Sequence, residues 1–267
     1  MGEVITLKSP AEIGKMARAA GVVAATIARV AKAVAPGIST ARLDEIAEKE
    51  ILERGAKPAF KGYRGYPKSL CVSINREVVH GIPSPGRLLA EGDIVSLDVG
   101  SLIDGFYGDG AVTLPVGVVS PEAMRLMVVT HDALWAGIAK ATSSGHLYDI
   151  SAAIDKVVTD AGYSTVREYV GHGIGRQMHE EPQVPNYTVK ERGRRLSPGL
   201  TLALEPMVNQ GGWRTRVLPD NWTVETADGS LSAHFEHTIA ITETEPRVLT
   251  IGLEEVTEQF TGGKAKL

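Results

Sequence analysis

The stretch from Ile94 to Leu114 reads IVSLDVGSLIDGFYGDGAVTL and has a strong two-residue hairpin turn, Asp104-Gly105, at its centre. Apolar residues recur on both sides of the turn, so the stretch predicts a β-hairpin with at least one buried face. Counting outward from the turn makes Asp98 and Asp109 diagonal neighbours on one face, roughly 6–8 Å apart at the backbone. Two carboxylates held that close repel each other unless a proton or a cation lies between them.

The predicted register puts Asp98 opposite Ala111 and Asp109 opposite Gly100. An acidic pair near a hairpin is also compatible with a solvated strand face and ordinary turn chemistry. Apolar residues nevertheless alternate with the acids, at Val95, Leu97, Val99 and Val112. If helices also cover the acidic face, the two charges need a metal ion.

A second stretch, from Tyr169 to Tyr187, reads YVGHGIGRQMHEEPQVPNY and concentrates histidines and glycines. Glycines on both sides of His172 suit a backbone that bends sharply or comes close to a ligand. Imidazole is the commonest neutral metal ligand and a proton carrier. Glu205 follows an apolar run that predicts a buried strand, and Glu236 lies in another such strand. Each of these acids alone is also compatible with a surface position at a strand end.

Five side chains from separate segments thus supply oxygen and nitrogen donors for one candidate metal site. They are Asp98, Asp109, His172, Glu205 and Glu236. Carboxylates with one imidazole suit a pair of Mn, Fe, Co or Zn ions, whereas structural zinc prefers cysteine and calcium avoids histidine. Two ions about 3.5–4 Å apart hold a water or hydroxide between them and polarise a substrate carbonyl. The donor set therefore predicts metal-assisted hydrolysis.

The composition is that of an ordinary globular protein of 267 residues, with 43% hydrophobic and 22% charged residues. A formal net charge of −4 offers no basic excess, so we expect no nucleic-acid partner. The single cysteine, Cys71, cannot form an internal disulfide, and no N-terminal stretch resembles a secretory signal, which favours the cytoplasm. Basic side chains interrupt the alanine-rich run of residues 13–35, which predicts an amphipathic helix and no membrane span.

Helix signals occur in two similar sets. The capping box Ser9-Pro10-Ala11-Glu12 predicts a long helix that ends before Pro36-Gly37, and a second helix follows between Ser39 and Gly55. Ser120-Pro121-Glu122 begins a third helix, and a fourth ends near Gly162.

Strand-like segments follow each helix pair, so the order helix, helix, strands occurs twice, roughly in residues 9–115 and 120–245. Sequence identity between the two ranges is slight, so only the order of elements predicts two similar α+β halves around one central site. No low-complexity linker separates them, and we expect a single catalytic domain over residues 1–267.

The chain resembles the type I methionine aminopeptidases over nearly its whole length. The matching segments are YRGYPKSLCVSINREVVHGIP from Tyr63 to Pro83, SLDVG and DGFYGD in the hairpin, GHGIGRQMHEEPQVPNY, LEPM around Glu205 and FEHT around Glu236. The resemblance implies the pita-bread fold, in which two pseudo-twofold-related halves of antiparallel sheet carry helices on the outer face. It also implies removal of the initiator methionine from nascent polypeptides whose second residue is small.

The resemblance distributes the five donors over two divalent ions with a bridging water or hydroxide. It implies that Asp109 and Glu236 bridge the ions and that Asp98 holds one of them. It further implies that His172 and Glu205 hold the other. Glu205 is also the implied proton shuttle for the bridging water.

Two further histidines, His80 and His179, are implied to orient the substrate and to stabilise the tetrahedral intermediate. Neutral imidazoles suit this task, since they can donate to an oxygen that becomes negative. In some relatives the backbone at positions that resemble Asn75 and Ser232 binds a monovalent cation, so we include one such ion among the expected cofactors.

The resemblance places the pocket for the methionine side chain at Tyr63, Tyr66, Cys71 and Trp222, with Phe60 and Met178 beside them. Aromatic walls and a soft sulfur suit an unbranched thioether. Cys71 is equally compatible with a small buried apolar residue. Phe60, Arg64 and Met178 depart from the residues of many relatives, and these changes concern pocket shape and entrance charge, not the metal ligands.

The remaining histidines have simpler interpretations. His131 and His146 lie on or near predicted helices, where exposed or capping positions are expected. Strand alternation points His234 to the same side as Glu236, which admits a supporting or ligand role. Glu180 and Glu181 are expected to support the site without binding metal.

Two other interpretations stay open. The first is a prolidase-like peptidase, which has the same fold and differs in its substrate. The second is a non-enzymatic pita-bread protein that binds ribosomes or RNA, and such proteins lack metal ligands. For the leading interpretation we expect nascent peptide N-termini as partners, transient ribosome association, no membrane contact, and a monomer.

Overall fold

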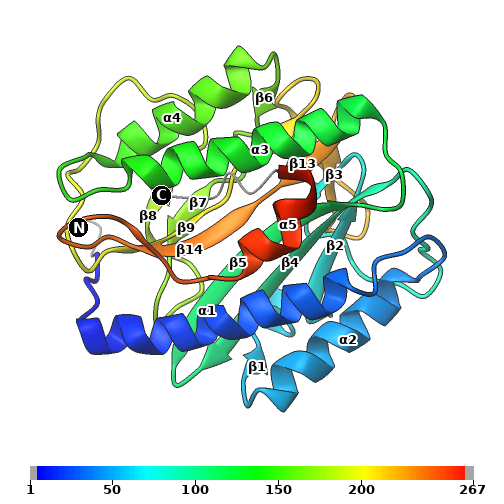
Figure 1. Cartoon of the computed structure of the whole chain (residues 1–267), viewed down its shortest axis with the longest axis horizontal. Coiled ribbons are helices and arrows are strands. Elements are labelled where there is room, and N and C mark those ends of the chain that lie inside the picture. Colours follow the sequence, from blue (N-terminus) through cyan, green and yellow to red (C-terminus); the bar gives the residue numbers. More distant parts are fainter. Residues whose placement is uncertain (1–4, 262–267) are drawn as a thin grey trace.

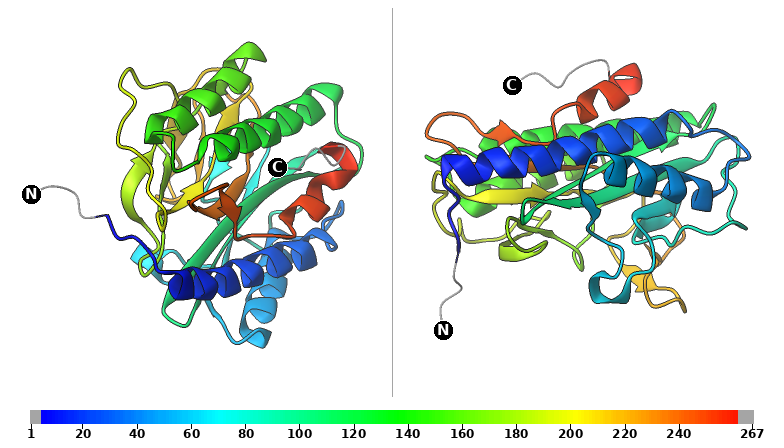
Figure 2. Two further views of the ribbon diagram at one scale, coloured as in Figure 1. Left: turned by 60° about the vertical axis from the view of Figure 1, so that its left-hand side comes forward. Right: turned by 90° about the horizontal axis from the view of Figure 1, so that it is seen from below.

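A layer of helices covers one face of a large antiparallel sheet, and loops and short strands project on the other side (Figures 1 and 2). The structure is a computed structural model that describes residues 5–261. Its helices are α1 (Pro10–Ala31), α2 (Thr40–Glu53), the 3-10 turn η1 (Tyr63–Gly65), α3 (Pro121–Lys140), α4 (Leu147–Asp160) and α5 (Leu253–Thr261). Its strands are β1 (Lys57–Pro58), β2 (Leu70–Ile74), β3 (Glu77–Val79), β4 (Ile94–Ile103), β5 (Phe106–Pro115), β6 (Ser164–Thr165), β7 (Gly171–Gly173), β8 (Glu180–Val184), β9 (Thr201–Leu204), β10 (Met207–Asn209), β11 (Thr215–Val217), β12 (Val224–Thr226), β13 (Ser232–His234), β14 (Glu236–Ala240) and β15 (Arg247–Val248).

Serine side chains begin the first three long helices where the sequence predicts. The Ser9 hydroxyl accepts the N–H of Glu12 at 3.4 Å while the Glu12 carboxylate accepts the N–H of Ser9 at 2.8 Å, which confirms the capping box of α1. The hydroxyls of Ser39 and Ser120 cap α2 and α3. Helix α5 was not predicted, because nine residues are too few for a clear helical repeat of apolar positions.

The main sheet has nine strands and draws on both halves of the chain. Its path runs β1-β4-β5-β14-β9-β7-β8, while β2 pairs with β4 and β15 pairs with β14. Two further sheets, β13-β10-β6 and β11-β12-β3, have three strands each. β5 and β14 join the halves, where Glu236 pairs with Ala111. This arrangement agrees with the expected α+β class, and the internal repeat of residues 9–115 and 120–245 stays a prediction.

The main hydrophobic core lies between the helices and the sheet. Ile27 of α1, Leu97 of β4 and Leu126 of α3 belong to it and are fully buried. Helix α1 approaches β5 closely, because a Cβ on Gly108 would lie only 2.5 Å from the backbone nitrogen of Ala20. Side chains of a strand alternate between its faces, so the neighbours of Gly108 point away from α1.

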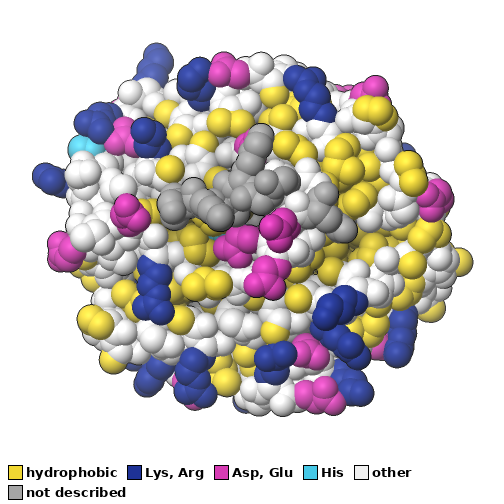
Figure 3. All heavy atoms as spheres, in the orientation of Figure 1, with side chains coloured by type: hydrophobic (Ala, Val, Ile, Leu, Met, Phe, Trp, Pro, Cys, Tyr) yellow, Lys and Arg dark blue, Asp and Glu magenta, His cyan; other side chains and the backbone are white. Residues whose placement is uncertain are grey.

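Charged side chains of both signs are mixed on the helical face of the molecule. In Figure 3, Lys and Arg side chains lie among Asp and Glu side chains, and no extended basic patch is visible on the described part of this face. Within residues 5–261, no helix combines the length and the apolar character that a bilayer crossing requires.

Candidate active site

The two aspartates of the hairpin lie where the sequence predicts. β4 and β5 pair in one continuous register that puts Asp98 opposite Ala111 and Asp109 opposite Gly100, which confirms the predicted pairing. Because Gly108 faces α1, the adjacent Asp109 points to the opposite face of the sheet. Both aspartates therefore project on the side away from the helices.

Strand pairing brings the other donors to the same face. Ala111 lies between Asp98 on one neighbouring strand and Glu236 on the other. Directly opposed residues of antiparallel strands point to the same side, and the small alanine side chain leaves space between the two carboxylates. In a second row of paired residues across the sheet, His172 of β7 lies opposite Ala203 of β9, which is two residues before Glu205. Two rows of the sheet thus present the predicted donors together.

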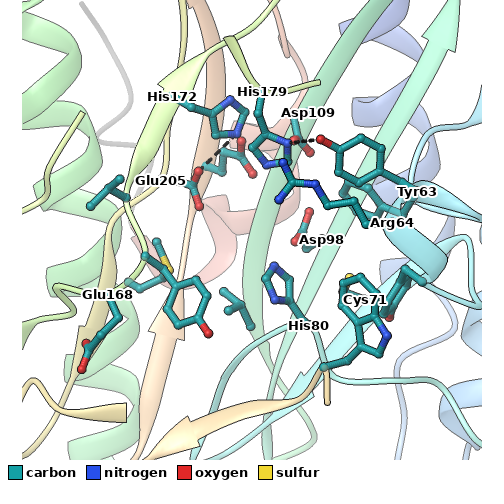
Figure 4. Close-up of a pocket in the computed structure, with 18 residues that line it drawn as sticks. Tyr63, Arg64, Cys71, His80, Asp98, Asp109, Glu168, His172, His179 and Glu205 are labelled. Atoms are coloured by element: carbon teal, nitrogen blue, oxygen red, sulfur yellow. Dashed lines mark hydrogen bonds and ion pairs between the residues drawn. The ribbon is translucent and has the colours of Figure 1, made fainter. Parts of the chain in front are cut away.

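The predicted donors converge on a common space (Figure 4). One ligand atom from each of Asp109, His172 and Glu236 lies within 4.8 Å of the others. Nε2 of His172 is 3.4 Å from Oε1 of Glu205. Asp98 is near enough for its charge to raise the pKa of Asp109, Glu205 and Glu236. All five predicted donors are therefore brought together.

The acidic group is buried, and burial disfavours its negative charges. Burial raises the pKa of Asp98 to about 7. Burial is also the main cause that raises the pKa of Asp109, Glu205 and Glu236, and neighbouring carboxylates raise it further. Within residues 5–261, Oδ1 of Asp98 and Oε1 of Glu236 have no hydrogen-bond partner. Unpartnered buried carboxylates are costly, and a cation among them removes that cost, so these residues fit divalent metal ions.

His172 presents a neutral ring nitrogen to this group. Its Nδ1–H donates to the carbonyl of Gly173 at 2.8 Å, and the tautomer assigned by this bond leaves the Nε2 lone pair directed toward the carboxylates. Burial, together with the smaller effect of the neighbouring His179, lowers the pKa of His172 to about 3. A neutral imidazole oriented in this way is a suitable ligand for a divalent ion.

A cavity of about 320 Å³ lies directly beside the acidic group. Its lining includes all five donors and also Phe60, Tyr63, Tyr66, Cys71, His80, His179 and Trp222. The rings of Tyr66 and Trp222 meet edge to face with centroids 5.1 Å apart. Burial raises the pKa of the Cys71 thiol, which keeps this side chain uncharged. The cavity therefore has an aromatic and sulfur-bearing wall next to its acidic floor.

Met178 is not among the residues that line this cavity. It is buried in the core, and a Cβ on Gly100 would lie 2.6 Å from both Met178 Cε and Phe60 Cε1. Phe60 and Met178 therefore lie together over Gly100, and only Phe60 reaches the cavity. Met178 is placed to influence the pocket through Phe60 and not by direct contact.

His80 and His179 lie on the cavity wall. Nδ1 of His179 is 2.9 Å from the Tyr63 hydroxyl. His80 has a backbone φ of 62°, an uncommon conformation for a non-glycine residue that is found mainly where surrounding structure enforces it. Burial lowers the pKa of His80 to about 4, and burial followed by the charge of Arg64 lowers the pKa of His179. Both rings are therefore neutral near pH 7, and each carries one N–H to donate.

Lys8 belongs to the site region without any sequence pattern that predicts it. Its side chain is 2% exposed and forms an ion pair with Glu180, and its Nζ also donates to the carbonyl of Thr6 at 2.9 Å. The other Glu180 oxygen accepts the N–H groups of Arg176 at 2.7 Å and Gln177 at 3.1 Å. Glu180 thus orders the loop before His179, which agrees with a supporting role.

The expectation of an exposed or capping position is wrong for His131. It lies on the buried face of α3, where Trp135 donates its indole N–H to His131 Nε2 at 3.0 Å. The helix packs against Phe235, and this contact buries the ring. His146 does precede α4 as its N-cap residue, as expected.

The two backbone positions implied for a monovalent cation are adjacent. The carbonyl of Asn75 accepts the N–H of Ser232 at 2.9 Å. A cation at this point stays a prediction.

The fold and the site together define a metallohydrolase, with buried carboxylates and one imidazole beside an aromatic cavity. The chain belongs to metallopeptidase family M24, whose model matches residues 14–243.

Individual relatives agree with this assignment. The chain is 49% identical to methionine aminopeptidase 1 of Bacillus subtilis over 247 residues, which cover 92% of this chain and 99% of the relative. It is 44% identical to the methionine aminopeptidase of Escherichia coli, with 92% and 94% covered. The crystal structure of methionine aminopeptidase from Thermotoga maritima matches with a TM-score of 0.91 at 44% identity, covering 92% of this chain and 99% of that structure.

A more distant likeness concerns the fold alone. The prolidase from Pyrococcus furiosus matches with a TM-score of 0.72 at 20% identity, covering 91% of this chain and 65% of that structure. Together these similarities confirm the predicted family and the pita-bread fold.

Proposed function

We propose that this protein removes the N-terminal methionine from nascent polypeptides whose second residue is small, by metal-dependent hydrolysis. The observation that carries the proposal is that an aromatic cavity of about 320 Å³ adjoins the five converging donors. A thioether side chain makes favourable contacts with aromatic rings. With its side chain against Tyr66 and Trp222, an N-terminal methionine brings its own carbonyl carbon toward the donors.

Two divalent ions are assigned to the residues Asp98, Asp109, His172, Glu205 and Glu236. Asp109 and Glu236 would contribute to both ions, Asp98 would hold one of them, and His172 and Glu205 would hold the other. When bound, such ions supply an activated water and polarise the substrate carbonyl. The donor chemistry suits Co, Mn, Fe or Zn.

Glu205 is the proposed proton carrier. Its carboxylate can accept a proton from the attacking water. The same carboxyl group then gives the proton to the leaving amine. Its position beside His172 keeps it at the acidic floor of the cavity.

His80 and His179 are proposed to bind the substrate and to stabilise negative charge on its carbonyl oxygen. The Tyr63 hydroxyl, 2.9 Å from His179 Nδ1, can donate to that nitrogen and so keep the ring proton on Nε2. A neutral N–H donor in a buried site stabilises a developing oxyanion strongly. Arg64, at the cavity edge, adds positive charge near His179.

We further propose a single catalytic domain over residues 1–267 that acts as a cytoplasmic monomer in transient contact with ribosomes. The shared nine-stranded sheet supports one domain, since β5 and β14 connect the two halves. The resemblance to methionine aminopeptidases supports nascent N-termini as substrates and a monovalent cation near Asn75 and Ser232.

The test is methionine release from a Met-Ala-Ser peptide by protein reconstituted with Mn²⁺, with an Xaa-Pro dipeptide measured in parallel. We expect release from the first peptide and no cleavage of the second. Asp109→Ala and His172→Ala should each lower kcat/KM by more than about 100-fold, since each removes a proposed ligand. His146→Ala is the matched control, because His146 lies at the start of α4 outside the site.

Cleavage of the Xaa-Pro dipeptide instead would favour a prolidase-like enzyme. A protein that binds no divalent ion, or ligand variants that keep full activity, would contradict the proposal and favour a non-enzymatic role.

A further inference from the structure

His234 is a buried histidine for which strand alternation admits a supporting or ligand role. It ends β13 with 2% exposure, and within residues 5–261 neither of its ring nitrogens has a hydrogen-bond partner. A buried polar ring without partners is costly, so natural proteins rarely keep one without a function.

The His234 ring faces the carboxylate of Glu205. Its Nε2 is 3.7 Å from Oε2 of Glu205, whereas Nε2 of His172 is 3.4 Å from Oε1. The carboxylate therefore has an imidazole near each of its oxygens. Strand pairing fixes this arrangement, since Met207, two residues after Glu205, is the direct partner of His234 in the β10–β13 ladder.

A single threonine clamps the backbone of His234 to the main sheet. The N–H of His234 donates to Oγ1 of Thr113 at 2.8 Å, and the Thr113 hydroxyl donates to the carbonyl of His234 at 2.9 Å. Thr113 lies on β5, the strand that carries Asp109, and its Oγ1 is 2.8 Å from the hydroxyl of Ser96. This clamp holds His234 at a fixed distance from the strands that present the donors.

We propose that His234 is a positioning residue that orients the carboxylate of Glu205. With its proton on Nε2, the ring donates to Oε2 of Glu205 after a small rotation that closes the separation of 3.7 Å to hydrogen-bond length. The bond holds Oε2 in place, so that Oε1 stays directed toward the space beside His172. The inference rests on the proposed function, which assigns Glu205 to metal binding and proton transfer.

The test compares His234→Leu with His234→Gln. Leucine removes both ring nitrogens, whereas the glutamine amide keeps an N–H donor near the same point. Residues that orient a metal-binding group typically contribute 10–100-fold to affinity or activity. In His234→Leu we therefore expect the Kd for Mn²⁺ at one site to rise about 10–100-fold and kcat to fall by a similar factor. KM for Met-Ala-Ser should change by less than about threefold, and His234→Gln should stay within about threefold of the parent protein in all three quantities.

Stability measurements separate positioning from a structural role. In the metal-free protein, where neither ring nitrogen of His234 has a hydrogen-bond partner among residues 5–261, replacing the ring by an apolar side chain is nearly neutral or stabilising, so Tm of His234→Leu measured without metal should not fall. His131→Gln is the matched control, because His131 is similarly buried but accepts a hydrogen bond from Trp135 of the same helix, α3. That change should lower Tm and leave the Kd for Mn²⁺ unchanged.

Three results would overturn the proposal. A His234→Leu variant with parental Kd for Mn²⁺ and parental kcat excludes a positioning role. One fewer bound Mn²⁺ per chain at saturation makes His234 a direct ligand. A lowered Tm that glutamine does not rescue makes the residue structural. If the parent protein binds Mn²⁺ but releases no methionine, the proposed function fails while the Kd comparison still tests His234.

Discussion

Loss of the ion pair between Lys8 and Glu180 should lower the free energy of unfolding by an amount that depends on which partner is replaced. In Glu180→Leu, the Lys8 ammonium stays 2% exposed and keeps only the carbonyl of Thr6 as a described partner. Removing one partner of a buried pair costs about 3–5 kcal/mol, because the remaining charge is uncompensated. We therefore expect the free energy of unfolding to fall by about that amount.

Lys8→Met should cost less. The Glu180 side chain is 13% exposed, and its carboxylate still accepts the N–H groups of Arg176 at 2.7 Å and Gln177 at 3.1 Å. The remaining charge is thus partly compensated, and we expect a loss of about 1–3 kcal/mol. The double variant Lys8→Met/Glu180→Leu leaves no buried charge, so it should be more stable than Glu180→Leu alone.

Urea denaturation at constant pH measures these free energies, and Arg42→Met is the matched control. Arg42 pairs with Glu45 on the surface, where both side chains are more than 60% exposed, so its loss should cost less than about 1 kcal/mol. A Glu180→Leu variant no less stable than Lys8→Met, or a double variant no more stable than Glu180→Leu, would refute the reasoning.

Three further predictions concern the site. In Gly173→Ala the new Cβ lies 2.3 Å from the carbonyl oxygen of Glu181, so we expect calorimetry to show loss of Mn²⁺ binding. Gly14→Ala on α1 is the control and should leave binding unchanged, because a Cβ there meets nothing within 4 Å. Tyr63→Phe removes the hydroxyl 2.9 Å from His179 Nδ1 and should lower kcat for Met-Ala-Ser about 10-fold; an unchanged kcat would show that this bond does not orient the ring. In the metal-free protein, the stability that Asp98 contributes, measured against Asp98→Asn, should be lost as pH rises from about 4 through about 7. Between these values the Asp98 carboxyl group binds a proton in the folded chain but not in the unfolded chain, because its pKa is about 7 in the fold against an ordinary 3.8. Urea titrations at several pH values check this, and bound Mn²⁺ should flatten the dependence.

Local patterns predicted those parts of the structure that depend on neighbouring residues. The Asp104-Gly105 turn sets the register of β4 and β5, so the pairing of Asp98 with Ala111 could be counted from the sequence. The capping box at Ser9 fixes the start of α1 in the same way. The chemistry of the side chains grouped distant donors such as His172 into one expected metal site, and the resemblance to a known family supplied their division between two ions.

Features that depend on packing between distant segments could not be predicted. Lys8 is a single lysine before a helix, and nothing in its neighbourhood indicates a carboxylate from a residue 172 positions away. His131 has an ordinary helical surrounding in sequence, and its burial depends on Phe235 from another segment. Met178 has the chemistry of a pocket residue, yet it lies beside Phe60 over Gly100 and does not line the cavity.

We propose that the five converging residues make this chain a metal-dependent methionine aminopeptidase. The most direct measurement follows methionine release from Met-Ala-Ser while metal-free protein is titrated with Mn²⁺. We predict no release without metal, a rise that saturates by two ions per chain, and no rise in Asp109→Ala. Release that persists without metal, or that no divalent ion restores, would contradict the account.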